Sequence, residues 1–152
     1  MTKTTIYLGA DHRGFAKKEM VKNILLSTGQ DYYIIQDKGA TKEDPDDDFN
    51  DPAVAVARAV VKDPGSFGIL LCGSAHGVCM QANRFKGIRA IHAANAASAR
   101  IGRQHDDANI LCLSADRLSK FDIMNIIRNF FETKFDGGAN HYRRIKRLDK
   151  ET

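Results

Sequence analysis

The chain has 152 residues, of which 43% are hydrophobic and 28% charged, and its formal net charge is +4 at neutral pH. This balance is typical of a folded globular protein and excludes a disordered or collagen-like chain. A chain of this length is expected to form one domain, residues 1–152, with its own buried core. It contains no apolar stretch of the roughly 18 residues that a membrane span needs and no cleavable signal pattern, so we expect a cytoplasmic protein without a membrane partner.

Apolar and β-branched runs alternate with segments of helical periodicity along the whole chain. Strands are expected at residues 4–9, 32–36, 69–71, 88–92 and 110–113. Helices are expected at residues 16–26, 52–61, 78–85, 94–105 and 119–133, followed by a basic, helical segment at 140–148. The alternation predicts an α/β fold, in which a doubly wound, five-stranded parallel sheet has helices on both faces in a Rossmann-like three-layer sandwich.

The first expected strand is followed directly by Asp11 and His12. The ordinary interpretation of this pair is a helix cap with a polar neighbour. In an open parallel sheet, however, ligands bind at the carboxyl ends of the strands, which is where the pair would lie. Both interpretations stay open at this point.

A long polar segment, residues 37–50, follows the second strand. It is too acidic for regular structure, and loops longer than about 12 residues in a compact domain are often functional lids. The loop ends at Asp51 and Pro52, which supply a capping acceptor and a proline suited to the first helical position. We therefore expect a helix from Pro52 onward.

The third strand ends at Cys72, followed by Gly73, Ser74 and, after two residues, Gly77. A strand, a glycine-rich turn and a helix start place free backbone N–H groups near the thiol, and this setting should lower its pKa below the usual value of about 8.5. The cysteine could then act as a base or nucleophile, although a small buried hydrophobic residue is the alternative. A Cys-x5-Arg phosphatase loop and a Walker loop are both excluded, because Val78 stands where each needs a cation.

Other histidines and cysteines have simpler interpretations. His76 is either a pocket group or an exposed turn residue, whereas His92 is expected to be structural. His105 ends a helix, where a cation favours the helix dipole. Cys79 and Cys112 are expected in the core, and three cysteines without CxxC spacing indicate reduced thiols rather than disulfides or a zinc site.

Positive charge is concentrated in a basic C-terminal segment, residues 136–152, whereas residues 43–51 are acidic. The basic segment lacks interleaved aromatic residues apart from Tyr142, and no nucleic-acid-binding motif accompanies it. We therefore expect no nucleic-acid partner. The charge suits an anionic small molecule or a solvated helix end.

Four separated motifs carry a resemblance to a known family: residues 9–15 (GADHRGF), 72–77 with 82–90 (CGSAHG and ANRFKGIRA), 103–109 (RQHDDAN) and 137–144 (GGANHYRR). In this order they resemble the ribose-5-phosphate isomerase B family, which includes the galactose-6-phosphate isomerase subunits. The resemblance implies an aldose–ketose sugar-phosphate isomerase that works through an enediolate, without a metal or another cofactor. It also implies a homodimer with shared active sites, and it leaves open a dimer of dimers.

The resemblance assigns roles to individual residues. Cys72 would move a proton between C1 and C2, Ser74 would handle protons on the substrate oxygens, and His105 would open the sugar ring. Backbone N–H groups of residues 73–77 would hold the enediolate oxygen. The residues expected to contact the sugar phosphate are Asp11, His12, Gly73, His76, Gly77, Asp106, Asn109, Arg117, His141 and Arg144, with Arg117 and Arg144 on the phosphate.

The chain differs from the usual family residues at several places: Phe49 for a tyrosine, Asp106 for an asparagine, Asn140 for an arginine, and Ala75 and His76 within the glycine turn. Some members use a glutamate base at the position of Val78, which leaves Cys72 as the candidate base here. The first-choice reaction is ribose 5-phosphate to ribulose 5-phosphate. The alternatives are isomerisation of a six-carbon aldose 6-phosphate and a degenerate sugar-phosphate-binding module.

Overall fold

Five parallel strands form one sheet in the computed structural model, which describes residues 2–150. The strands are β1 (Thr4–Ala10), β2 (Tyr33–Asp37), β3 (Phe67–Cys72), β4 (Ala90–His92) and β5 (Ile110–Ser114). Their order across the sheet is β2-β1-β3-β5-β4. The predicted doubly wound parallel sheet is confirmed.

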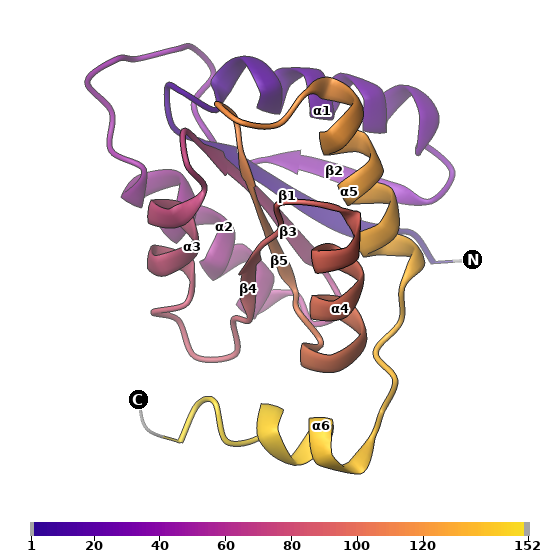
Figure 1. Ribbon diagram of the computed structural model, residues 1–152. Helices are drawn as coiled ribbons and strands as arrows, with labels where there is room; N and C mark the ends of the chain where they lie inside the picture. Colours follow the sequence, from indigo (N-terminus) through magenta and orange to yellow (C-terminus); the bar gives the residue numbers. More distant parts are fainter. Residues whose placement is uncertain (1, 151–152) are drawn as a thin grey trace.

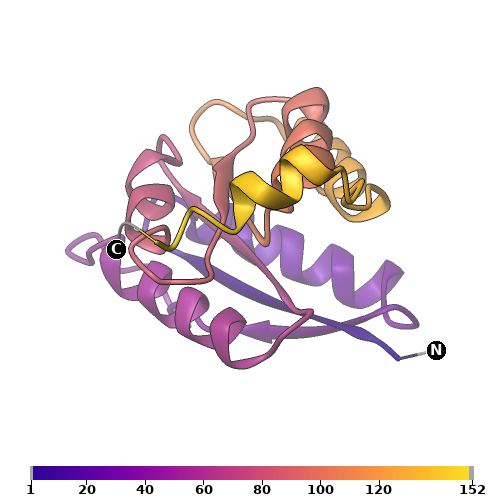
Figure 2. The ribbon, with the colours of Figure 1, turned by 90° about the horizontal axis from the view of Figure 1, so that it is seen from below.

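Helices cover both faces of the sheet (Figure 1). On one face lie α1 (Phe15–Thr28), α4 (Ala96–Asp106) and α5 (Lys120–Glu132), and on the other lie α2 (Asn50–Lys62) and α3 (His76–Ala82). The last helix, α6 (Ala139–Ile145), belongs to neither layer and contacts α4. It lies below the sheet in the view of Figure 1 and in front of it in Figure 2. The predicted basic segment is described as far as residue 150, and residues 151 and 152 lie outside the described residues.

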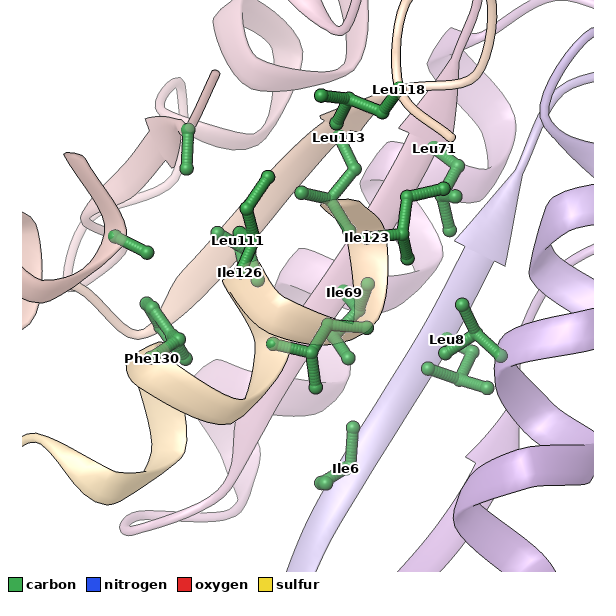
Figure 3. Close-up of a cluster of buried hydrophobic side chains, with 14 of the residues drawn as sticks. Ile6, Leu8, Ile69, Leu71, Leu111, Leu113, Leu118, Ile123, Ile126 and Phe130 are labelled. Carbon is green, nitrogen blue, oxygen red and sulfur yellow. The ribbon is translucent and has the colours of Figure 1, made fainter. Parts of the chain in front are cut away.

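The core follows from the alternation of side chains along the central strands. Figure 3 shows Ile69 and Leu71 of β3 on the face that packs against Ile123 and Ile126 of α5. Leu70 points the other way, into the cluster formed with α2 and α3. Central parallel strands are buried on both faces, which is why they are continuous apolar runs in the sequence.

Connections leave β1 and β3 in opposite directions, so the carboxyl ends of these neighbouring strands border a crevice. Ala10 is in register with Leu71, and the backbone N–H of Asp11 donates to the carbonyl of Leu71 at 3.3 Å. The chain after β1 therefore turns beside the end of β3. This point of the sheet is where a ligand site is expected.

Several boundaries differ from the sequence-based prediction. α2 begins at Asn50, so Pro52 is the third helical residue and no side chain caps the helix, contrary to the predicted Asp51 cap. A proline is tolerated there because the first backbone N–H groups of a helix have no intrahelical partner. α3 begins at His76 rather than residue 78, because Ala75 adopts a left-handed conformation, with φ of 72°, that ends the turn earlier.

The Ser119–Asp122 pair, by contrast, caps α5, whose predicted start is at residue 119. The Asp122 N–H donates to Ser119 Oγ at 3.1 Å, and the Ser119 N–H donates to Asp122 Oδ2 at 3.0 Å. Each side chain thus satisfies a free donor at the start of α5. Within residues 2–150, no helix combines the length and apolar character needed to cross a membrane.

Phe130 of α5 tests the packing of this core. Its side chain is fully buried and meets Phe67 at a centroid distance of 5.8 Å, whereas Phe121 in the same helix is 78% exposed. We expect Phe130→Ala to lower the free energy of unfolding by about 3–5 kcal/mol because it leaves a cavity. Phe121→Ala should change it by less than about 0.5 kcal/mol. Urea denaturation of both variants measures the difference, and equal losses would contradict this packing.

Candidate active site

Asp11 anchors the turn after β1. Its side chain is buried, and Oδ1 accepts a hydrogen bond from the Gly14 N–H at 3.0 Å. Gly14 itself lies so close to β3 that an added Cβ would stand 2.4 Å from the carbonyl oxygen of Leu71. Asp11 is not a helix cap, because α1 begins after Gly14 without a side-chain cap. It holds the turn before α1 instead, and it lies at the crevice between β1 and β3.

Cys72 ends β3 at the same crevice, but its side chain is only 4% exposed. Like Leu70 two residues earlier, it points toward α2 and α3, where Ala75 and Val78 belong to the same buried cluster. The alternative interpretation, a small residue packed at the edge of the core, thus describes most of the thiol's surroundings. The sequence had shown the strand end but not the direction of this side chain.

The turn after Cys72 is tied to the end of β5. The Ala115 N–H donates to the carbonyl of Cys72 at 2.9 Å, and Ser114 Oγ donates to the carbonyl of Gly73 at 2.7 Å. Ala75 is fully buried with a positive φ, a conformation that costs a non-glycine residue roughly 1–2 kcal/mol. Ser74, by contrast, is exposed and its Oγ accepts from the His76 N–H at 3.3 Å. The hydrogen bonds from the end of β5 thus hold the strained turn after Cys72 in one conformation.

His12 contacts the acidic loop, residues 38–49. One oxygen of Asp47, Oδ1, lies 3.0 Å from the His12 backbone nitrogen and 2.7 Å from Nδ1. The hydrogen bond to Asp47 raises the pKa of His12 above its usual value, and the negative charges of Asp11 and Asp47 act in the same direction. Burial of the ring and the charge of Arg13 oppose them. Sequence analysis missed Asp47 because nothing local distinguishes it from the acidic residues around it.

Two arginines lie at this edge of the sheet. Arg13 pairs with Asp116 across the turn, and a Cβ added at Gly73 would stand 2.9 Å from Arg13 Nε. The predicted residue Arg117 is exposed at the carboxyl end of β5, where its N–H donates to Ser114 Oγ at 3.2 Å. Arg13 was not predicted, because its partner is 103 residues away in the chain.

A second group of predicted residues lies at the opposite edge. α4 runs back across the sheet and is followed after three residues by β5, so His105 and Asp106 at its end lie near the amino end of β5. The His105 ring stacks on His141 of α6 with centroids 4.5 Å apart, and Arg144 is in the same short helix. Asp136 Oδ1 lies 3.0 Å from His141 Nδ1, and this hydrogen bond lowers the pKa of Asp136. Within one chain, these side chains therefore lie at the opposite edge of the sheet from Cys72 and Asp11.

Asn109, a predicted contact of the sugar phosphate, has a structural environment. Its Oδ1 accepts from the Arg89 N–H at 2.8 Å, and its Nδ2 donates to the carbonyl of Gly87 at 2.9 Å. Arg103, two residues before His105, is buried and donates to the carbonyl of Ala108 at 2.7 Å. These bonds hold the end of α4, and with it His105, in place.

The remaining histidines and cysteines also have defined surroundings. His92 is exposed rather than structural, and its ring lies 5.1 Å from that of His76. Burial and the neighbouring His76 lower its pKa. Cys112 is fully buried as predicted, and Cys79 is half-buried and hydrogen bonded to it. Burial raises the pKa of the Cys112 thiol well above its usual value, which keeps that thiol neutral.

The part of the chain that the structure describes holds one cluster suited to a metal ion, formed by His105, Asp136 and His141, whose ligand atoms all lie within 4.8 Å of one another. Two imidazoles and a carboxylate suit a borderline divalent cation. Asp136 and His141 already satisfy each other by a hydrogen bond. The prediction of a reaction without metal is not tested by this geometry.

A parallel α/β sheet with a cysteine, a carboxylate and a glycine turn at its crevice defines an enzyme-like ligand site. A family model described as Ribose/Galactose Isomerase matches residues 6–148. A probable ribose-5-phosphate isomerase B of Mycoplasma pneumoniae is 38% identical over 143 residues, covering 94% of this chain and 91% of the relative. The chain belongs to the ribose/galactose isomerase family, and it is an aldose–ketose isomerase.

Two further relatives mark the range of the family. The crystal structure of ribose-5-phosphate isomerase B from Mycoplasma genitalium with bound ribulose 5-phosphate is 35% identical, with a TM-score of 0.92, and the match covers 99% of this chain and 97% of that one. A galactose-6-phosphate isomerase subunit of Streptococcus pyogenes is 32% identical, covering 95% of this chain and 97% of the relative. Both pentose and hexose enzymes are therefore similar to this chain over almost its full length.

The His12–Asp47 contact predicts a measurable titration. Because the folded pKa of His12 is raised, protonation of His12 stabilises the fold fully below its usual pKa of about 6.5, and this contribution is lost as pH rises through the higher folded value. We expect the NMR titration midpoint of His12 to fall toward the usual value in Asp47→Asn and to stay unchanged in Asp46→Asn. An unchanged midpoint in Asp47→Asn would show that another group sets the pKa.

Proposed function

We propose that this isomerase interconverts ribose 5-phosphate and ribulose 5-phosphate, with Cys72 as the base. The observation that carries the proposal is the position of Cys72, at the end of β3 beside a glycine turn and the buried Asp11, in a chain of this family. The enzyme of Mycoplasma genitalium that binds ribulose 5-phosphate supports the choice of a pentose phosphate.

The reaction needs a base beside a carbonyl and donors for the charge that develops. The Cys72 thiolate takes the proton from C2 of the open-chain aldose, and the C–H electrons form the enediolate. The thiol then returns the proton to C1, while the exposed Ser74 hydroxyl moves a proton between the two substrate oxygens. Backbone N–H groups of residues 73–77 stabilise the enediolate oxygen, and one such donor is typically worth about 3 kcal/mol.

Ring opening and phosphate binding are carried out by residues at the carboxyl and amino edges of the sheet. His105 opens the furanose ring by moving a proton between the ring oxygen and the anomeric hydroxyl. His12, Arg117 and Arg144 hold the phosphate, which is a dianion suited to imidazolium and guanidinium donors. Of these, only His12 and Arg117 lie at the Cys72 edge of the same chain.

This separation supports a homodimer with shared active sites. His105, His141 and Arg144 are at the amino edge of their own sheet, so they serve the Cys72 of a second subunit. None of the seven residues of α6 is buried, and Tyr142 is 52% exposed, as expected of a helix that packs on a partner. Each site would then combine the crevice of one subunit with the α4 and α6 ends of the other.

A second candidate is isomerisation of a six-carbon aldose 6-phosphate. The similarity to the galactose-6-phosphate isomerase subunit favours it, as does Phe49, whose ring lies against Gly77 at the start of α3. This ring lacks the hydroxyl of the tyrosine usual in the family, and it lies beside the turn that would contact the sugar. Ribose 5-phosphate and galactose 6-phosphate assayed side by side distinguish the two candidates.

Replacement of Cys72 tests the mechanism. We expect Cys72→Ala to lower kcat/KM by about 100-fold to 10,000-fold, the usual cost of removing a general base. Cys79→Ala, which removes a neighbouring half-buried thiol, should retain activity within about threefold. Near wild-type isomerisation by Cys72→Ala would eliminate the cysteine mechanism.

Mixing two inactive variants tests the shared sites. Refolding Cys72→Ala together with His105→Ala should restore about a quarter of the wild-type rate, because half of the random dimers are hybrids and each hybrid holds one complete site. Cys72→Ala mixed with Cys72→Ser is the control and should stay inactive. Failure to recover activity, with hybrid dimers verified by mass spectrometry, would place both groups in a single-chain site.

A further inference from the structure

Asp47 differs from the acidic residues beside it. Its side chain is 18% exposed, whereas Asp46 and Asp48 are exposed residues. Its Oδ1 accepts a hydrogen bond from the backbone N–H of His12 at 3.0 Å, and the same oxygen lies 2.7 Å from Nδ1 of the His12 ring. Two donors therefore converge on one negatively charged oxygen.

The loop that carries Asp47 is fixed at both ends. Near its start, the fully buried Lys18 donates to the carbonyl of Ala40 at 3.1 Å. At its end, Phe49 lies against Gly77, and Nδ2 of the following residue, Asn50, donates to Gln81 Oε1 at 2.7 Å. The loop joins β2 to α2 in the chain, and on its way it contacts His12 after β1 and Gly77 of α3. It therefore passes beside the crevice between β1 and β3.

The donors on His12 suit other anions equally well. A backbone N–H and a protonated imidazole that bind a carboxylate oxygen also bind a phosphate oxygen, since both are charge-assisted hydrogen bonds. The charged groups that face His12 are Asp11, Asp47 and Arg13. With Asp47 in place, the backbone N–H and the Nδ1 donor of His12 are already used.

We propose that Asp47 is an internal competitor of the substrate, occupying in the free enzyme the position on His12 that a phosphate oxygen of the sugar phosphate takes. The inference rests on the proposed function, in which His12 holds the phosphate. Phosphate binding then requires Asp47 and its loop to leave His12. The apparent affinity is reduced by the fraction of molecules in which His12 is free.

Calorimetric titration of the full-length chain with inorganic phosphate tests this competition, at a pH about one unit below the usual histidine pKa of about 6.5, where His12 is protonated with or without Asp47. We expect Asp47→Ala to bind phosphate about tenfold more tightly than the wild type, the factor that applies if Asp47 occupies His12 about nine-tenths of the time. Asp46→Ala removes the same charge one residue away and should change the affinity less than twofold. The contrast between the two variants separates direct occupancy from general electrostatic repulsion.

Steady-state kinetics give a second readout. Asp47→Ala should lower KM for ribose 5-phosphate with kcat changed less than about twofold, because the carboxylate is absent from the substrate complex. Phosphate binding no tighter than in Asp46→Ala, weaker binding, or no binding by any of the three proteins would overturn the inference. A wild type that binds phosphate but does not isomerise ribose 5-phosphate would instead contradict the proposed function. The difference in phosphate affinity between Asp47→Ala and Asp46→Ala would then still decide whether Asp47 competes for His12.

Discussion

The parallel pairing of β1 with β3 is the constraint on which the site depends. It places the residues after both strands at one edge, and the opposite directions of their connections keep this edge free of a crossing helix. The close approach of Gly14 to Leu71 brings the start of α1 against the end of β3. Asp11 and Cys72 become neighbours through this packing, although 60 residues separate them in the sequence.

Much of this arrangement is predictable, because it depends on local rules. The alternation of apolar runs and helical segments gives the sheet, and the glycines after Cys72 mark the turn. The capping box at Ser119 and Asp122 is also a local pattern, and it starts α5 at the predicted place. Helix boundaries were less well predicted, as at Asn50 and His76, because tertiary packing extends or shortens the last turn.

Other features depend on distances that a sequence pattern does not contain. The choice of Asp47 among several acidic residues follows from the path of its loop, and the Arg13–Asp116 pair follows from the approach of two turns. The burial of Cys72 follows from the alternation of side chains along β3, which puts it on the same face as Leu70. The position of His105 at the far edge could have been inferred, since a helix after a parallel strand returns antiparallel to it and ends at the opposite side.

The seven residues of α6 are too few to form a stable helix on their own, since isolated helices shorter than about 12–15 residues are marginal in water. Within the chain, α6 relies on the stacked histidines and on the Asp136–His141 hydrogen bond. In the proposed dimer, the ordering of this helix and the meeting of two subunits are therefore one thermodynamic event. Dilution would separate the ring-opening histidine of one subunit from the base of the other, while each sheet stays folded.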